Sequence, residues 1–130
     1  MIKKSMDESK KGFIKNLGGI SFKKIDDKNF EFTSSIKETH LNTGGIAHGG
    51  YLASIADAGM GTAAHMISEN KRCVTINLEL KFISAGKLSD NLIGKVKILK
   101  KTKSLIFISC EIHGSSDIVV SATGTWKILN

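Results

Sequence analysis

The sequence predicts an α+β domain in which an antiparallel sheet accompanies one long helix. Residues 48–69 are dominated by Ala, Gly and apolar side chains, and we expect one helix of 22 residues there, about 33 Å long at about 1.5 Å per residue. Segments typical of strands precede and follow it, so the predicted order is ββαββββ with mostly hairpin-length connections. Short connections join antiparallel neighbours, and the order therefore favours an α+β fold.

One short helix and two strands are predicted before the long helix. Residues 5–16 can form an amphipathic helix, which Gly18-Gly19 would end because glycine readily adopts the left-handed conformation found after helices. Residues 20–25 and 29–37 have the composition of strands separated by a turn. Residues 38–47 are then predicted to be a loop that leads into the long helix.

Four strands are predicted after the long helix. In the first, at residues 74–82, apolar and polar residues alternate strictly, which is typical of a half-buried strand. Its apolar positions are Val74, Ile76, Leu78, Leu80 and Phe82, and Thr75, Asn77, Glu79 and Lys81 lie between them. Further strands are expected at about 91–100, 104–113 and 117–128.

The composition is that of one soluble globular domain. The chain has 130 residues, 41% of them hydrophobic and 24% charged, which suffices for a single core. No apolar run reaches the length of a membrane span, and residues 1–19 lack the apolar centre of a secretory signal, so we expect a cytoplasmic protein that does not enter membranes. Cys73 and Cys110 are then expected to be reduced, buried and small.

Asp57 is the unusual residue of the long helix. It is the one charged residue between Tyr51 and Ile67, and no Lys or Arg stands three or four positions away to form a helical ion pair. A carboxylate on an apolar helix is costly to bury unless it is paired, hydrogen-bonded or functional. From these residues alone, a structural hydrogen-bond acceptor and a functional carboxylate remain equally open.

The sequence His48-Gly49-Gly50 stands where the long helix is predicted to begin. The first N–H groups of a helix have no internal partners and carry the positive end of the helix dipole. Without side chains in the way, they can polarise a carbonyl group and hold the oxyanion that forms on attack. The alternative is a glycine turn needed only to redirect the chain.

Seven residues form a pattern that is known from a protein family. They are His40, Asn42, Gly45, His48, Gly49, Gly50 and Asp57. This pattern resembles the signature of hotdog-fold acyl-CoA thioesterases of the phenylacetate-pathway, or PaaI-like, branch. Residues 73–78 resemble the strand after the family's long helix, and residues 82–87 resemble its exit. The resemblance covers residues 18–128 and implies a single hotdog domain, a sheet wrapped around one long central helix, with residues 1–17 as a helical extension.

The resemblance also implies roles for individual residues. Asp57 would be the general base or the nucleophile, and the N–H of Gly49 would polarise the thioester carbonyl. Asn42 and His48 would position the substrate or the attacking water. Thr75 would hydrogen-bond to that water or to Asp57, while Gly50 would allow the substrate to approach. No metal or redox cofactor is implied, since coenzyme A is part of the substrate.

The spacing of two of these residues requires more than one subunit. Gly49 and Asp57 are eight residues apart on one helix, which corresponds to about 12 Å of rise. A base or nucleophile must lie within about 3 Å of its target, so one carbonyl cannot contact both residues of the same chain. If both act on one thioester, they belong to different subunits, related by a two-fold axis between antiparallel helices. We expect a homodimer that assembles further into a homotetramer.

The formal charge of +7 indicates either solubility alone or an anionic partner. A basic cluster at residues 95–104 contributes to it, and its lysines can face solvent on a hairpin or bind the phosphates of coenzyme A. Under the second interpretation, the contacts come from Lys100, Lys101, Lys103 and Ser104. Nucleic acid is a poorer partner because the aromatic residues are not interleaved with the lysines as a base-stacking platform requires.

Other chemistries are poorly supported. The four histidines form no H-x-x-x-H pair, and there is no Cys-x-x-Cys, so we expect no metal site. Cys110 lies within an apolar run without an adjacent base, which disfavours a cysteine nucleophile. Residues 59–64 match a dinucleotide-binding pattern but follow no strand, so they indicate close helix packing. A serine-triad hydrolase is excluded because no G-x-S-x-G elbow occurs.

The sequence therefore predicts an acyl-CoA thioesterase that converts an acyl- or aryl-CoA ester and water into the free acid and coenzyme A. Two alternatives remain open: a hotdog hydratase or dehydratase acting on an acyl thioester, and a non-catalytic acyl-CoA binding module. The sequence does not distinguish an aryl from an alkyl acyl group, since either kind of pocket could be lined by Tyr51, Leu52, Met60 and Phe82.

Overall fold

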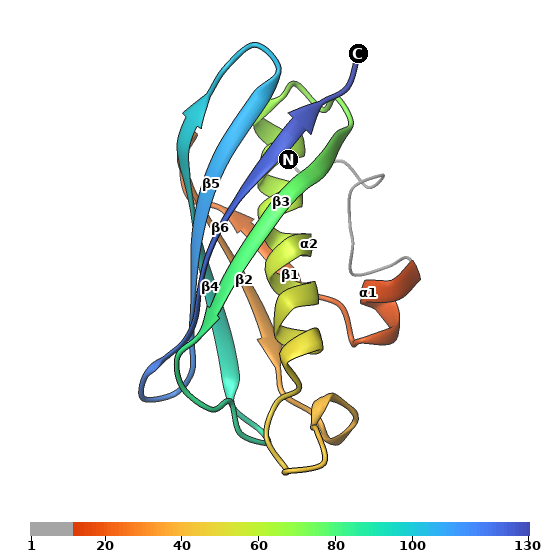
Figure 1. The fold of residues 1–130 in the computed structure, drawn as a ribbon, viewed down its shortest axis with the longest axis vertical. Helices are drawn as coiled ribbons and strands as arrows, with labels where there is room; N and C mark the ends of the chain where they lie inside the picture. Colours follow the sequence, from red (N-terminus) through yellow and green to blue (C-terminus); the bar gives the residue numbers. More distant parts are fainter. Residues whose placement is uncertain (1–11) are drawn as a thin grey trace.

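The computed structural model describes residues 12–130, which form one antiparallel sheet and one long helix (Figure 1). The six strands follow the spatial order β1-β2-β4-β5-β6-β3. The elements are α1 (Gly12–Asn16), β1 (Ser21–Lys24), β2 (Asn29–Ser35), the 3₁₀ turn η3 (Glu38–His40), α2 (Gly49–Ile67), β3 (Cys73–Phe82), β4 (Asn91–Lys101), β5 (Leu105–His113) and β6 (Ile118–Ile128). The predicted α+β class, the element order and the antiparallel pairing are confirmed.

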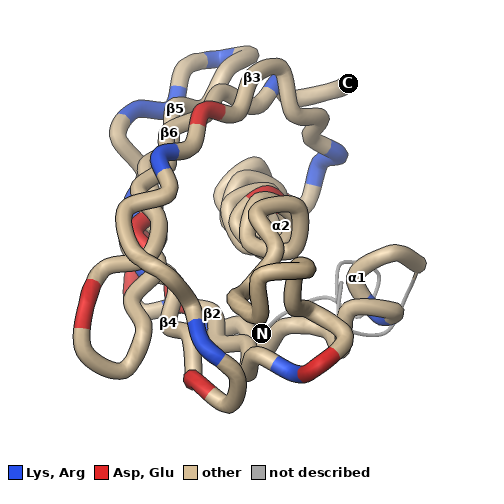
Figure 2. Tube along the Cα trace, turned by 60° about the horizontal axis from the view of Figure 1, so that its bottom comes forward, with Lys and Arg blue, Asp and Glu red and all other residues tan. Residues whose placement is uncertain are grey.

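The sheet curves around α2, as the view along the helix in Figure 2 shows. Alternate residues of β4, β5 and β6 are buried, and their apolar side chains pack against the concave side on which α2 lies. α2 is buried on most of its surface, including Ile55, Ala56 and Met60, which have no exposed area. The arrangement is the hotdog fold expected from the resemblance. None of the helices within residues 12–130 is long and apolar enough to cross a membrane.

α1 is short and ends as the glycine pair predicted. The N–H of Gly19 donates to the Ile14 carbonyl at 2.8 Å, and the N–H of Gly18 donates to the Lys15 carbonyl at 3.0 Å. With Gly18 at φ +94°, these two bonds form a Schellman motif, which satisfies carbonyls that a helix end otherwise leaves free. Residues 5–11 of the predicted helix lie outside the described residues.

α2 begins and ends within two residues of the prediction. His48 is its N-cap, and Ser68 is its C-cap. Glu69 and Asn70 then adopt positive φ values of 56° and 61°, which stops the helix and turns the chain into β3.

Close packing of α2 on the sheet depends on two glycines that sandwich one aromatic ring. Phe32, on β2, lies between Gly59 of α2 and Gly94 of β4. A Cβ at Gly59 would lie 2.2 Å from the Phe32 ring, and one at Gly94 would lie 2.1 Å from it. This contact confirms that Gly59 serves close helix packing, and the predicted topology is unchanged.

The strict alternation predicted for β3 is wrong at one point. Thr75 pairs with Trp126 and Asn77 with Thr125, so Ile76 is an extra residue in a β-bulge. The bulge shifts the phase of the strand: Thr75 before it and Leu78 after it both face α2. Val74 and Ile76, expected in the core, are 42% and 56% exposed. β3 is also the edge of the sheet, with one side unpaired within the described chain.

Candidate active site

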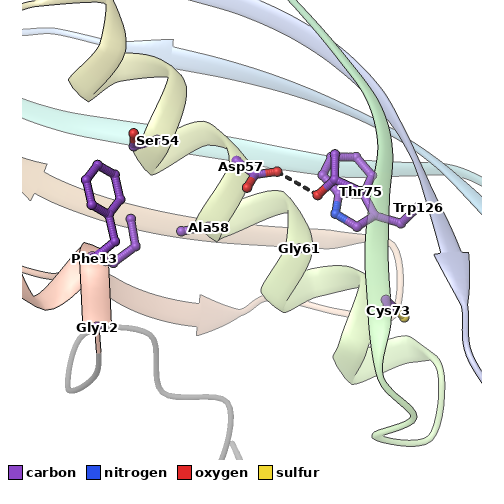
Figure 3. Close-up of a pocket in the computed structure, with 10 residues that line it drawn as sticks. Gly12, Phe13, Ser54, Asp57, Ala58, Gly61, Cys73, Thr75 and Trp126 are labelled. Atoms are coloured by element: carbon purple, nitrogen blue, oxygen red, sulfur yellow. Dashed lines mark hydrogen bonds between the residues drawn. The ribbon is translucent and has the colours of Figure 1, made fainter.

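Asp57 and Thr75 form a hydrogen-bonded pair between α2 and β3. The Thr75 hydroxyl donates to Oδ1 of Asp57 at 2.8 Å, and the Asp57 side chain is half-buried (Figure 3). Oδ2 of Asp57 accepts a hydrogen bond from no residue between 12 and 130. Thr75 thus fixes one carboxylate oxygen, while the second remains free to accept a proton or attack a carbon. The bulge in β3 makes this contact possible, because without it Thr75 and Leu78 would face opposite sides.

The pair opens into a hollow of about 500 Å³ between α1, α2 and the β3–β6 edge. α2 contributes Ser54, Ala58 and Gly61, which lie on the same face as Asp57. The remaining walls are Gly12, Phe13, Ile14, Cys73, Thr75 and Trp126 (Figure 3). Neither a lysine nor an arginine is among these lining residues.

At the start of α2, the N–H of Gly50 is hydrogen-bonded, and the N–H of Gly49 has no partner among the described residues. Nδ1 of His48 accepts a hydrogen bond from the Gly50 N–H at 2.8 Å, which caps the helix. A Cβ at Gly50 would lie 3.0 Å from that nitrogen, so the cap explains the glycine. The N–H of Gly49 donates to none of the described residues, and a Cβ there would meet Phe82 at an ordinary 3.4 Å. The N–H of Gly49, which was predicted to polarise the carbonyl, is therefore available, whereas the N–H of Gly50 is engaged by the cap.

Asn42 shapes the loop before α2 with one end of its side chain. Its Oδ1 accepts hydrogen bonds from the N–H groups of Gly44 at 2.9 Å and Ile46 at 3.2 Å. Two donors aimed at this atom fix which end is the oxygen. The amide nitrogen, Nδ2, has no hydrogen bond to the described part of the chain, so the side chain holds the loop and still presents a donor.

Asn42 and Gly49 share a second hollow, of about 350 Å³, with the segment that follows β3. Its other lining residues are Ile46, Ala47, Leu52, Phe82, Ile83, Ser84, Ala85 and Gly86. The Ala47 N–H donates to the Gly86 carbonyl at 2.8 Å and joins the two loops. Leu52 and Phe82 lie here, whereas Tyr51 and Met60 are core residues and line neither hollow.

The predicted site residues thus fall into two half-sites in one protomer. Asp57 and Thr75 belong to the first hollow, and Asn42 and Gly49 to the second, with no lining residue in common. The separation along α2 is the one that the sequence spacing required. His48 is exposed beside the second half-site, with Nε2 carrying the proton because Nδ1 accepts a hydrogen bond.

The lysine cluster lies in a third hollow of about 600 Å³ at the C-terminal end of α2. Lys100 and Lys101 line it together with two further lysines and two acidic residues, and its apolar lining includes Met66 and Leu99. The other charged residues are Lys24, Lys28, Asp27 and Glu69. Lys103 and Ser104 are exposed in the β4–β5 turn and line none of the three hollows. Within one protomer, this cluster is not brought next to Asp57 or Gly49.

Three other side chains of reactive types, His40, His65 and Cys110, are buried and have structural roles. His40 is buried, its Nδ1 accepting from the Lys37 N–H at 2.9 Å and its Nε2 lying 2.6 Å from the Leu17 carbonyl oxygen. His65 is buried late in α2, with Nδ1 2.8 Å from the Lys71 carbonyl oxygen. Burial raises the pKa of the Cys110 thiol to about 12, so the thiol is protonated at neutral pH and is not a nucleophile. Residues 12–130 contain no group of three metal-binding side chains.

The residues that sequence reasoning missed line the Asp57 hollow. Ser54 and Gly61 could have been found from helical spacing, since they stand three and four positions from Asp57, and Ala58 is its direct neighbour in the sequence. Phe13 and Trp126 could not, because they reach the hollow only through tertiary packing from α1 and β6.

Sequence comparison identifies the family of a chain with this fold and these half-sites. The profile of the thioesterase superfamily matches residues 44–121, and the chain belongs to this family. The Pseudomonas aeruginosa protein named "Putative esterase PA0474" is 34% identical over 94 residues, which cover 72% of this chain and 70% of the relative. Mouse acyl-coenzyme A thioesterase 13 is 30% identical over 90 residues, covering 68% of this chain and 64% of that protein.

Solved structures agree on the fold. The PaaI protein of Escherichia coli, from the phenylacetic acid degradation operon, superposes with a TM-score of 0.84 at 22% identity, covering 94% of this chain and 87% of that one. A hypothetical thioesterase from Streptococcus pneumoniae TIGR4, solved with coenzyme A, has a TM-score of 0.79 at 25% identity, covering 86% and 90%. Two further structures of that protein carry an aspartate-to-alanine and a threonine-to-alanine substitution.

Proposed function

We propose that this protein is an acyl-CoA thioesterase of the PaaI-like branch, which hydrolyses an acyl thioester to the free acid and coenzyme A. The observation that carries the proposal is the Asp57–Thr75 hydrogen bond of 2.8 Å beside an open hollow. Membership of the thioesterase superfamily supports the reaction type. Coenzyme A bound to the pneumococcal relative supports this carrier.

In the proposed reaction, the free oxygen of Asp57 either removes a proton from water or attacks the thioester carbon itself. Thr75 holds the other oxygen and keeps the carboxylate oriented. The unbonded N–H of Gly49, at the positive end of the α2 dipole, would donate to the carbonyl oxygen as negative charge develops on it. The Asn42 amide would position the substrate or the attacking water.

The proposed reaction joins half-sites of two subunits. The β3 edge is suited to such an association because it offers unpaired backbone groups together with exposed apolar side chains. Val74, Ile76 and Phe82 are 42%, 56% and 56% exposed there. A two-fold axis near this edge would bring Gly49 of one α2 helix towards Asp57 of the other, twice in each dimer.

We also keep the lysine cluster as a candidate contact for the phosphates of coenzyme A. Lys100 and Lys101 share their hollow with Lys24 and Lys28, and the lysines outnumber the two acidic residues there, Asp27 and Glu69, although Asp27 forms an ion pair with Lys24 at 2.8 Å. Since this hollow is separate from both half-sites of its own chain, such a contact would be made to substrate bound at a neighbouring subunit.

The test is release of free thiol from acyl-CoA esters by the wild type and by Asp57→Asn. The substitution is isosteric but removes basicity and nucleophilicity, so we expect a loss of turnover of at least about 10²-fold. Binding of coenzyme A, measured by calorimetry, should be unchanged. Thr75→Ala should cause a smaller loss, since the carboxylate remains but is held less firmly. Wild-type turnover in Asp57→Asn would overturn the assignment of this carboxylate.

The same assay separates the alternatives. A hydratase would change the absorbance of an enoyl-CoA without releasing thiol, and a binding module would do neither. Rapid-quench measurements also separate the two roles of Asp57: a nucleophile releases coenzyme A in a burst before the acid appears, whereas a general base releases both together.

A further inference from the structure

We infer that α1 forms one wall of the acyl-binding pocket, and that Phe13 selects apolar acyl groups that carry no second carboxylate. The inference rests on the proposed function, since it assigns the 500 Å³ hollow beside Asp57 to the acyl part of the substrate. It gives a residue outside the catalytic pair a role in specificity, and it defines a chemical class of substrate.

The hollow has the shape of a trough along α2. Ser54, Ala58 and Gly61 form its floor on the helix, with Asp57 on the same face. Phe13 stands over the Ser54 end on one side, while Thr75 and Trp126 stand on the other (Figure 3). An acyl group whose carbonyl carbon is held at Asp57 therefore has an aromatic side chain from α1 within the same hollow.

The absence of a side chain at Gly61 deepens the floor of the trough. A Cβ at Gly61 would lie 3.3 Å from Nε1 of Trp126, so any side chain at this position would occupy the space between the helix and the indole. Glycine within a helix costs about 1 kcal/mol relative to alanine. The space that Gly61 leaves open for an acyl group is a functional reason for a glycine at this position.

Most polar side chains of the trough are already hydrogen-bonded within the protein. The Ser54 hydroxyl donates to the Gly50 carbonyl at 2.7 Å, the Thr75 hydroxyl donates to Asp57, and the Cys73 thiol lies 3.5 Å from the Ser68 hydroxyl. Oδ2 of Asp57 and the indole N–H of Trp126 have no hydrogen bond to the described residues, and neither a lysine nor an arginine is in the described lining. An acyl group with a terminal carboxylate would meet the like charge of Asp57 without a lysine or arginine from the described lining to offset it, while a hydrocarbon would meet carbon surface.

The backbone around Phe13 is anchored, although 66% of the residue is exposed. Its neighbour Ile14 is buried in the core, and the Schellman motif fixes the chain after α1. The contact between Nε2 of His40 and the Leu17 carbonyl, at 2.6 Å, ties this segment to the loop before α2. An aromatic ring on this anchored segment gains from covering a hydrocarbon, because burial of apolar area from water is favourable.

The first test compares acyl chains in the wild type, Phe13→Ala and Phe13→Leu. For decanoyl-CoA, Phe13→Ala should raise KM and lower kcat/KM about tenfold, as expected when much of one aromatic contact is lost. Hydrolysis of acetyl-CoA, which does not reach the ring, should change less than about twofold, and Phe13→Leu should restore most of the decanoyl activity. Phe107→Ala, an exposed phenylalanine on β5 outside the hollow, is the matched control and should change neither substrate.

The second test compares two substrates of nearly equal length in the wild type. Succinyl-CoA should be hydrolysed with kcat/KM at least about tenfold below that for butyryl-CoA, because only succinyl brings a second carboxylate near Asp57. Equal values for the two substrates would overturn the charge argument. Equal losses for acetyl and decanoyl groups in Phe13→Ala, or no loss for either, would overturn the role of Phe13.

A binding measurement keeps the inference separate from the proposed reaction. Decyl-CoA, a thioether that cannot be hydrolysed, should bind the wild type about tenfold more tightly than coenzyme A alone, and Phe13→Ala should remove most of this difference. If no thioester is hydrolysed but this pattern holds, the proposed function fails and the acyl pocket stands. If decyl-CoA gains nothing over coenzyme A, or gains equally in Phe13→Ala, the acyl pocket is wrong whatever the enzyme hydrolyses.

Discussion

At the scale of single residues, the site uses both ends of one side chain for different purposes. The carbonyl oxygen of Asn42 organises the loop by accepting from Gly44 and Ile46, and its amide group is left to face the hollow shared with Gly49. The sequence pattern assigned Asn42 to the substrate alone. An alanine substitution there would remove the loop bonds together with the donor, so its effect could not be assigned to either.

Asn42→Asp separates the two roles. An aspartate keeps an oxygen for the two loop N–H groups but cannot donate, so the free energy of unfolding should change by less than about 1 kcal/mol. If the amide contacts substrate or water, kcat/KM should fall at least about tenfold, since a hydrogen bond in the transition state is lost and a negative charge is added. Asn42→Ala should lose activity and also stability, measured by urea unfolding. Full activity in Asn42→Asp would limit Asn42 to holding the loop.

At the scale of elements, local patterns predicted most of the structure, and they failed where one strand departs from its period. The α2 boundaries follow from His48 as a cap and from the residues after Ser68, both of which are local signals. In β3, the alternation placed Thr75 on the polar face, while the family resemblance placed it at the site. The bulge at Ile76 resolves this conflict. It could not be predicted from the residues of the strand, because a bulge is defined by the pairing of β3 with β6.

The packing of α2 predicts a strong effect of Gly59→Ala. The new Cβ would lie 2.2 Å from the Phe32 ring, and the ring cannot retreat because Gly94 receives its other side. Overpacking of this kind costs about 1–3 kcal/mol, which exceeds the gain of up to about 1 kcal/mol in helix propensity. We therefore expect a lower free energy of unfolding and a lower urea midpoint with an unchanged slope.

Two further variants test this cause. Gly61→Ala makes the same change two positions along the same helix, where the new Cβ approaches only Trp126 at 3.3 Å, and it should be close to neutral for stability. Phe32→Leu combined with Gly59→Ala should be less destabilising than the sum of the single changes, with a coupling of about 0.5–3 kcal/mol. Strict additivity would contradict a clash between these two residues.

At the scale of the whole molecule, the sequence predicted the separation of the candidate site residues along α2 but not the spaces around them. Gly49 and Asp57, eight residues apart, line two hollows without a common residue, so the proposal that both act on one thioester calls for two subunits. The hollows themselves depend on distant segments: Phe13 from α1 and Trp126 from β6 line the hollow of Asp57, and the Ala47 N–H donates to the Gly86 carbonyl in the other. Such contacts have no local period, so the acyl pocket and the position of the lysine cluster could not be derived in advance.

Sharing of the site between subunits predicts that two inactive variants can restore activity together. In a mixed dimer of Asn42→Asp and Asp57→Asn, one site carries both substitutions, and the other combines an intact Asn42 with an intact Asp57. If subunits exchange at random, half of the dimers are mixed and each has one intact site, so activity should reach about one quarter of the wild type. Each variant mixed with itself is the control and should keep its own reduced activity. No recovery after verified exchange, or full activity in a monomer measured by light scattering, would show that one chain suffices and that the two hollows do not belong to one shared site.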